Sequence, residues 1–328
     1  MKKELSDCPS PIIIGFLDND SPKKYNRIIR YLVIILGDYI MSIYNISLKS
    51  NYLFGPTELS VIMPNPSMGD EPEEFYGSGK KFKVLWLLHG GLNDHHDWLL
   101  GTNIGRYVTE RGVMAVIPNA LNSDFSNHPG FADGYNFCDF FFHELMPFIY
   151  SWFPASADPN DNFLSGYSMG AAGTWFYGLL HPEKFGGIAP LSSAPWNYSH
   201  LEPYRDMSSA EFRTRALANS QAFPAAYGKP GSGIHLKEIN MITKFPTVGE
   251  FLDSAEYAWN RVKEIAAAGK FPKTYLPGSS KDSKLLEFKK YTEELEIKEI
   301  SYDLSDVDAH CFEFWDNAIQ KAMDFFGI

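Results

Sequence analysis

The stretch Asn162-Phe-Leu-Ser-Gly-Tyr-Ser-Met-Gly170 decides the fold of this chain. An apolar, strand-like run ends in Gly166-Tyr-Ser-Met-Gly170, which is the G-x-S-x-G pattern of a nucleophile elbow. In such an elbow a strand turns sharply into a helix, and the small flanking residues let the central serine adopt a strained backbone with its hydroxyl exposed. The following run, 171–180, is apolar and helix-like. The sequence therefore predicts that Ser168 is a catalytic nucleophile.

The composition is that of a globular protein with a sizeable core. The 328 residues are 45% hydrophobic and 15% aromatic, enough for one large α/β domain or two small ones. The net charge of −11, with no basic patch to offset it, argues against a nucleic-acid partner. The cysteines Cys8, Cys138 and Cys311 are too few and too scattered for a disulfide framework or a zinc site. A reducing cytoplasm fits this usage best.

The first 40 residues differ from the rest. Their apolar run, Tyr31–Leu36, is too short to span a membrane and lacks the flanks of a signal peptide, so we expect a cytoplasmic protein without membrane contacts. Two interpretations of residues 1–40 stay open. One is an N-terminal extension; the other is a translated leader ahead of a native start at Met41. Gly37-Asp38 favours the second, because GGAGAT can encode it and resembles a bacterial ribosome-binding site.

From Met41 the pattern predicts strands first, then alternating strands and helices. Residues 43–48 and 58–64 alternate like an antiparallel pair joined by a turn at Gly55-Pro56. Apolar runs that predict further strands lie at 82–88, 113–118, 187–192, 273–277 and 299–303, and helices are expected at 102–111, 135–153 and 312–326. Repeated strand–helix units predict an α/β protein with a mostly parallel, twisted sheet and helices on both faces.

Residues 194–270 break this rhythm within a single predicted domain, 41–328. They contain no sheet-like run, are rich in Pro, Tyr and Trp, and have helical segments at 209–219 and 248–267. An insert at this point of the chain would lie over the carboxyl ends of the strands, where ligands bind in open α/β sheets. We expect a helical, lid-like insert; the alternative is a helical elaboration packed to the side.

A serine hydroxyl needs an adjacent base, normally a histidine that a carboxylate orients. In α/β-hydrolase folds the chain order is serine, then acid, then histidine. This order leaves four candidates for the base, namely His181, His200, His235 and His310. His310 follows the last predicted strand and precedes the last helix, where the base must reach over the sheet. We therefore predict that His310 is the base.

The acid should follow the strand before last, and Asp282 lies in that loop. Three aspartates nearer to His310 in the sequence, Asp303, Asp306 and Asp308, are the alternatives, and we expect them at solvated loop and turn positions. The sequence predicts Asp282 as the acid.

Acyl transfer also needs backbone amides that stabilise the developing oxyanion. One is that of Met169, directly after the nucleophile, and the other should come from the loop after the strand 82–88. Gly91 is the first choice there and Leu92 the second. His89 in the same loop is expected to be structural.

Histidines and aspartates cluster after this loop, at His89, Asp94, His95, His96 and Asp97. Their spacing matches no ordinary zinc or iron motif, and a serine hydrolase needs no metal. We predict neither a metal nor a cofactor in the reaction.

Several motifs in order resemble a known family. They are Leu87-Leu-His-Gly-Gly-Leu-Asn-Asp-His-His-Asp-Trp98, Val116-Ile-Pro-Asn119, the elbow, and His310 followed by Phe314-Trp315. Over roughly 41–328 the chain resembles the esterase D-type "putative esterase" family, and within it bacterial tributyrin esterases most. The family also includes S-formylglutathione hydrolases, feruloyl and acetylxylan esterases, and mycolyltransferases. The resemblance implies an α/β-hydrolase fold and a two-step acyl-serine mechanism. It implies Ser168, Asp282 and His310 as the triad and Gly91 and Met169 as oxyanion donors.

The sequence thus predicts a serine carboxylesterase that hydrolyses short-chain acyl esters of small molecules. One alternative is a carbohydrate-ester hydrolase that removes acetyl or feruloyl groups from oligosaccharides, with the aromatic insert as a sugar platform. Another is a catalytically silent hydrolase-fold binding protein, against which the complete set of Ser168, Asp282 and His310 argues. Assembly into a homo-oligomer stays open.

Overall fold

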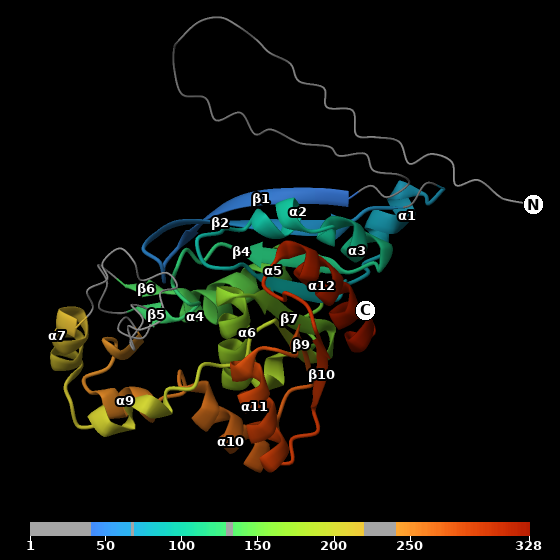
Figure 1. Cartoon of the computed structure of the whole chain (residues 1–328). Coiled ribbons are helices and arrows are strands. Elements are labelled where there is room, and N and C mark those ends of the chain that lie inside the picture. Colours follow the sequence, from blue (N-terminus) through green and yellow to red (C-terminus); the bar gives the residue numbers. More distant parts are fainter. Residues whose placement is uncertain (1–40, 67–68, 129–133, 220–240) are drawn as a thin grey trace, which may run out of the picture.

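The computed structural model describes residues 41–66, 69–128, 134–219 and 241–328 (Figure 1). The two interpretations of residues 1–40 therefore lie outside the described residues. Within the described ranges, no helix combines the length and the apolar character needed to cross a membrane.

The centre of the structure is an eight-stranded sheet with the order β1-β2-β4-β3-β7-β8-β9-β10. The strands are β1 Met41–Ser50, β2 Gly55–Pro64, β3 Val84–Leu88, β4 Met114–Pro118, β7 Asn162–Tyr167, β8 Gly187–Leu191, β9 Thr274–Ser279 and β10 Ile300–Ser305. Strand β2 pairs antiparallel with both β1 and β4, and the remaining neighbours are parallel. The prediction of a mostly parallel sheet that begins with an antiparallel pair is confirmed.

The turn between β1 and β2 differs from the prediction. It lies at residues 51–54, whereas Gly55 and Pro56 already pair with Ser50 and Lys49 as the start of β2. The hydroxyl of Ser50 accepts hydrogen bonds from the amides of Tyr52 and Leu53, and Phe54 takes a positive φ of 51°. A serine side chain that mimics a backbone turn thus closes the hairpin, in place of the expected glycine and proline.

The helices are α1 Pro72–Gly77, α2 Asp97–Gly101, α3 Ile104–Glu110, α4 Phe137–Asp139, α5 Met146–Trp152, α6 Met169–Leu180, α7 Ser209–Asn219, α9 Val248–Leu252, α10 Ala258–Ala267, α11 Ser283–Glu294 and α12 Phe312–Phe326. A π-helical segment, η1 Phe140–Leu145, joins α4 to α5, and short 3-10 helices lie at η2 Pro159–Asp161, η3 Pro182–Lys184 and η4 Ser199–Tyr204. A small hairpin pairs β5 Asn127–His128 with β6 Tyr135–Asn136.

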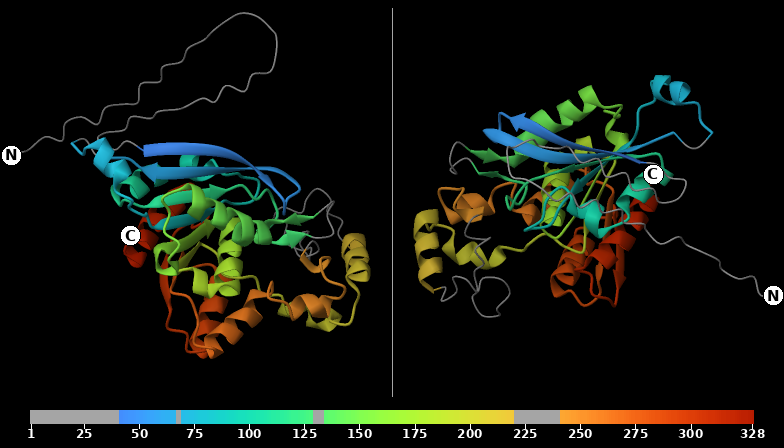
Figure 2. Two further views of the ribbon diagram at one scale, coloured as in Figure 1. Left: turned by 180° about the vertical axis from the view of Figure 1, so that it is seen from behind. Right: turned by 90° about the horizontal axis from the view of Figure 1, so that it is seen from above.

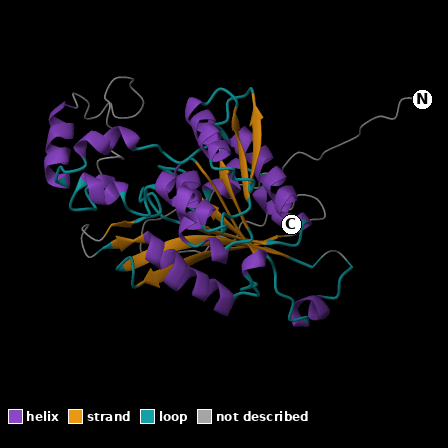
Figure 3. Cartoon of the chain, turned by 90° about the horizontal axis from the view of Figure 1, so that it is seen from below, coloured by secondary structure: helices purple, strands orange, loops and turns teal. Residues whose placement is uncertain are grey.

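Helices cover both faces of the sheet, as predicted (Figures 2 and 3). Successive residues of β3 point to opposite faces, so Leu85 and Leu87 enter a different core from Trp86 and Leu88. The core around Leu85 and Leu87 includes residues of α2, α3 and α12. The core around Trp86 and Leu88 includes residues of η1, α5, α6, α10 and α11. Burial on both faces explains why the central strands β3, β4 and β8 are apolar throughout.

The helix expected at 135–153 forms in pieces. Its first two residues belong to β6, and the central segment is π-helical. The aromatic residues Phe137, Phe140 and Phe141 are buried, so they pack in the core as predicted. The wider π turn also buries the next residue, Phe142.

The described part of the 194–270 insert is helical, as predicted, but the helix expected at 248–267 is two helices, α9 and α10, with residues 253–257 between them. Helix α10 packs on α6, the helix that follows Ser168. Its Trp259 indole donates to the carbonyl of Pro195, and Arg261 donates to that of Leu179. Helices α7 and α9 lie at the periphery, on the side of β5 and β6 (Figures 1 and 2).

Candidate active site

Ser168 lies between β7 and α6 with φ 55° and ψ −116°, the strained conformation expected of a nucleophile elbow. The flanking glycines make this turn possible. A Cβ atom at Gly166 would lie 2.4 Å from the carbonyl oxygen of Gly170, and one at Gly170 would lie 2.3 Å from that of Leu88. Both contacts are to backbone, which cannot move aside, so only glycine fits at these two positions. The predicted turn from strand to helix at Ser168 is confirmed.

The parallel strands bring the other candidate segments to the same edge of the sheet. Strands β3, β7, β8, β9 and β10 all end there, so the residues that follow them gather around Ser168. These residues are the glycine loop at 89–92, Ser192, and the loops that carry Asp282 and His310.

The two segments that are predicted to supply the oxyanion hole lie side by side. Met169 is the first residue of α6, so its amide has no partner within the helix. A Cβ atom at Gly91 would lie 3.9 Å from the Cβ atom of Met169, which places the glycine loop beside the elbow. The amide of Leu92 donates to Asn122 Oδ1 over 2.7 Å and is thus already engaged. The geometry favours Gly91 over Leu92 as the second donor.

His89 is fully buried and uses both ring nitrogens. Nδ1 lies 2.7 Å from the carbonyl oxygen of Gly90, and Nε2 accepts from the amide of Ala120 over 2.9 Å. Burial lowers the pKa of His89, which keeps the imidazole neutral with its proton on Nδ1. This bonding supports the structural role expected of His89, because the ring ties the glycine loop to the segment after β4.

His310 is exposed just before α12 and is linked to the elbow through aromatic rings. Its imidazole packs edge-to-face on Trp315, with ring centroids 5.2 Å apart. Trp315 in turn stacks on Tyr167, the residue before Ser168, at 4.2 Å and 23°. The Trp315 indole donates to Ser192 Oγ over 2.8 Å, which fixes the ring. Trp315 belongs to one of the motifs quoted above, but the sequence predicts no role for it in positioning the candidate base, His310.

The other histidines lie elsewhere. His181 follows α6 and bonds Glu183 over 3.0 Å, and His200 lies in η4 of the insert. His235 falls outside the described residues.

Asp282 is half-buried and caps α11. Its Oδ1 accepts from the amides of Lys284 and Leu285 over 2.9 and 3.3 Å. Within the part of the chain that the structure describes, no hydrogen bond joins the side chains of Ser168, Asp282 and His310 to one another. Catalytic hydrogen bonds are often long in the absence of substrate, so this geometry excludes none of the three residues from a catalytic role. The triad stays a prediction.

The alternative acids have other partners. Asp303 accepts from the hydroxyl of Tyr275 and from Lys321 of α12, and the bond from Lys321 is the main cause that lowers its pKa. Asp308 accepts from the amide of His310 over 3.0 Å, and Asp306 forms an exposed ion pair with Lys281.

A pocket lies between α6 and the insert, one helical turn beyond the nucleophile. Ala172, whose amide donates to the carbonyl of Ser168, lines it together with Trp175. The insert contributes Trp196 and Tyr198 to its wall. The insert thus contributes to a pocket near Ser168, and its role as a lid stays a prediction.

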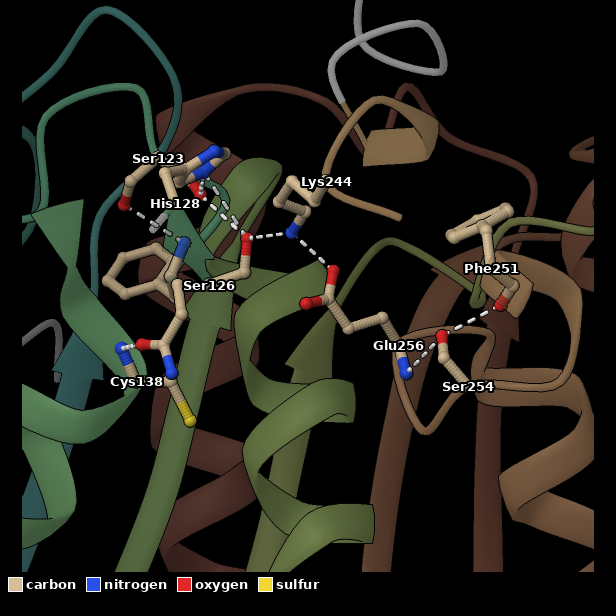
Figure 4. A network of polar contacts seen from close by, with 10 residues as sticks. Ser123, Ser126, His128, Cys138, Lys244, Phe251, Ser254 and Glu256 are labelled. Carbon is tan, nitrogen blue, oxygen red and sulfur yellow. Dashed lines mark hydrogen bonds and ion pairs between the residues drawn. The ribbon is translucent and has the colours of Figure 1, made fainter. Parts of the chain in front are cut away.

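A buried polar network fixes this part of the insert to the core (Figure 4). Lys244 forms a buried ion pair with Glu256, which itself lines the pocket, and donates to Ser126 Oγ over 2.8 Å. His128 Nε2 lies 2.9 Å from the carbonyl oxygen of Ser123, and burial lowers the pKa of this histidine. No local sequence signal could have indicated the network, because its members are far apart along the chain.

Asp94, His95 and His96 also come together, on the loop that continues from Gly91. One potential ligand atom from each lies within 4.8 Å of the others. His96 Nδ1 lies 3.1 Å from Asp94 Oδ1. His95 is buried, and its Nδ1 has no hydrogen-bond partner among the described residues. Burial, with the neighbouring His96 next, lowers the pKa of His95. These side chains could hold a metal ion.

Comparisons with known proteins agree with the fold and the elbow. Residues 67–226 match the family described as "Putative esterase". An acetyl esterase of Caldicellulosiruptor saccharolyticus is 30% identical over 157 residues, which are 47% of this chain and 57% of that protein. The chain therefore matches little more than half the length of this relative.

Two solved structures share the fold. The fluorophosphonate-binding serine hydrolase F of Staphylococcus aureus has a TM-score of 0.62 at 21% identity, covering 88% of this chain and 99% of that one. A ferulic acid esterase has a TM-score of 0.62 at 17% identity, covering 87% and 97%. Over residues 67–226 the chain is similar to the "Putative esterase" family, and its structure has the α/β-hydrolase fold.

Proposed function

We propose that this chain is a serine carboxylesterase that cleaves short-chain acyl esters through an acyl-serine intermediate. The observation that carries the proposal is the strained backbone of Ser168, with the amide of Met169 and the glycine loop at Gly91 beside it. The acetyl esterase relative and the matched family support the same chemistry. A cytoplasmic location and a preference like that of tributyrin esterases stay predictions.

In the proposed reaction, Ser168 Oγ attacks the ester carbonyl carbon while His310 takes the hydroxyl proton. The amides of Gly91 and Met169 stabilise the oxyanion of the tetrahedral intermediate, and Asp282 stabilises the imidazolium. The alcohol leaves with the proton from His310. Water then attacks the acyl-serine by the same route and releases the acid.

A carbohydrate ester is the second candidate substrate. The wall of the pocket one helical turn beyond Ser168 includes the partly exposed rings of Phe176 and Trp196, on which a sugar or a feruloyl group could stack. A ferulic acid esterase is among the proteins that share the fold of this chain.

Hydrolysis of nitrophenyl acetate, butyrate, octanoate and ferulate by the wild type and by Ser168→Ala tests the proposal. We expect the highest kcat/KM for acetate or butyrate and a loss of about 10³-fold or more in Ser168→Ala. Preference for the ferulate ester would favour the second candidate. Comparable rates in the Ser168→Ala protein would contradict the mechanism, and absence of hydrolysis in the wild type would favour a binding protein.

A further inference from the structure

We infer that Asp94, His95 and His96 form a binding site for a divalent transition-metal ion of the zinc type. The site lies outside the proposed serine chemistry and does not depend on it. Imidazole nitrogens and a carboxylate oxygen are the ligands that zinc takes alongside thiolates.

The first observation is the convergence of three different side chains. A ligand atom of each lies within 4.8 Å of the others. Around tetrahedral zinc the ligand atoms would be about 3.3 Å apart, so they need to close by about 1.5 Å at most. Asp94 and His96 have side chains that are 50% and 43% exposed, which leaves them free to rotate by this amount. A water molecule would complete the tetrahedron, as is common where a protein supplies three ligands.

The second observation is the unsatisfied nitrogen of His95. The residue is only 2% exposed, and among the described residues its Nδ1 is the buried side-chain nitrogen or oxygen that lacks a hydrogen-bond partner. Burying a polar nitrogen without a partner is unfavourable, so such an atom points to a ligand. The ring lies 3.9 Å, centroid to centroid, from that of His96, within the same cluster.

The surroundings favour a cation. Asp97 Oδ2 accepts from the amide of Asp94 over 2.7 Å, which places a second carboxylate against the cluster. Glu58 of β2 is near enough to act electrostatically on His95. The carboxylates of Asp94 and Asp97 thus lie at the two imidazoles, and their negative potential would stabilise a bound divalent ion.

The position of the site connects it with the elbow. Asn93, directly before Asp94, donates to the hydroxyl of Tyr167 over 2.9 Å, and Trp98 donates to the carbonyl of Leu88 over 3.1 Å. A metal ion held between these two anchors would order the loop that begins at Gly91.

Calorimetric titration of zinc chloride into the EDTA-treated full-length protein tests the site. We expect one zinc ion per chain, and an affinity at least about tenfold weaker in His96→Gln and in Asp94→Asn. Zinc should also raise the Tm of the wild type by roughly 5 °C at saturation, but not that of either variant. Both substituted side chains are half-exposed, and the Tm without zinc checks that the variants fold.

Two matched controls separate this site from other histidines. His181 forms a similar histidine–carboxylate pair, 3.0 Å from Glu183, but belongs to no potential metal cluster among the described residues, so His181→Gln should bind zinc as the wild type does. His310→Gln should also retain zinc binding, because the candidate base is not a ligand. Unchanged affinity in His96→Gln, loss of binding in His310→Gln, or no binding by the wild type at micromolar zinc would each overturn the inference.

Discussion

The indole of Trp315 stacks on the ring of Tyr167, with ring centroids 4.2 Å apart and planes inclined by 23°. This contact joins the last helix to the residue before the nucleophile. Because His310 packs edge-on against the same indole and Ser192 accepts its N–H, Trp315 fixes the candidate base relative to the elbow.

Replacing Trp315 should therefore impair the reaction more than replacing an exposed tryptophan does. We expect Trp315→Leu to lower kcat/KM about tenfold or more, because a lost aromatic contact of about 1.4 kcal/mol corresponds to that factor. Trp315→Phe should lose less, since it keeps a ring to stack. The control is Trp152→Leu, at a side chain that is 77% exposed.

A purely structural role for Trp315 would lower the stability and leave the pH profile of kcat/KM unchanged. We expect the acidic limb of that profile to shift, because the surroundings of the proposed base, His310, change. Wild-type kcat/KM and pH profile in a folded Trp315→Leu protein would contradict the positioning role.

The acid can be tested without disturbing α11. Asparagine caps helices about as well as aspartate, so Asp282→Asn removes the charge but keeps the cap. If Asp282 orients His310, kcat should fall by about 10²–10⁴-fold, whereas Asp306→Asn should have little effect. Steady-state kinetics with a nitrophenyl ester decides between them. The reverse ranking would move the acid to the loop after β10.

The elbow glycines should be essential for folding. In Gly170→Ala the new Cβ atom would lie 2.3 Å from the carbonyl oxygen of Leu88, so we expect a loss of about 2–3 kcal/mol or more in the free energy of unfolding. Urea denaturation measures it. Gly77→Ala is the control, because a Cβ atom there meets nothing within 4 Å. Equal stability of the two variants would contradict the close approach of β3 and α6.

Stability should fall as the pH is lowered below about 6.5, the ordinary pKa of histidine. Burial lowers the pKa values of His89, His95 and His128 in the folded protein. The unfolded chain therefore binds protons first, and each histidine can remove up to about 1.4 kcal/mol per pH unit in the window between its two pKa values.

Urea denaturation between pH 7.5 and 5.5 checks this dependence. The depressed pKa values of Asp94 and Asp303 matter only at lower pH, because their unfolded pKa is about 3.9. The slope should be flatter in His89→Gln and in His128→Gln than in the wild type. A stability that is constant or rises toward pH 5.5 would contradict neutral, buried histidines.

Local signals predicted the elbow, the core strands and α12, because an apolar run, two glycines and a helical period are each readable within a few residues. The sequence predicts Ser168 and its backbone strain for the same reason. The turn at 51–54 was placed wrongly because the hydroxyl of Ser50 replaces the expected glycine.

Contacts between distant segments could not be predicted. The stack of Trp315 on Tyr167 and the ion pair of Lys244 with Glu256 depend on how the helices pack, and neither has a spacing signal. The sequence did not predict helix α11, because the helix is mostly polar, although Asp282 before it is a typical N-cap residue. The convergence of Asp94 and His96 with His95 likewise follows from the loop conformation rather than from a motif.

The central claim is that the hydroxyl of Ser168 is an activated nucleophile. Treatment of the folded protein with a fluorophosphonate probe, followed by mass spectrometry of the peptides, tests it most directly. The account predicts one adduct per chain, on Ser168, and none on the nearby Ser165, whose hydroxyl donates to the carbonyl of Ala189 over 2.7 Å. No adduct on the folded wild type, or the same adduct in Ser168→Ala, would contradict it.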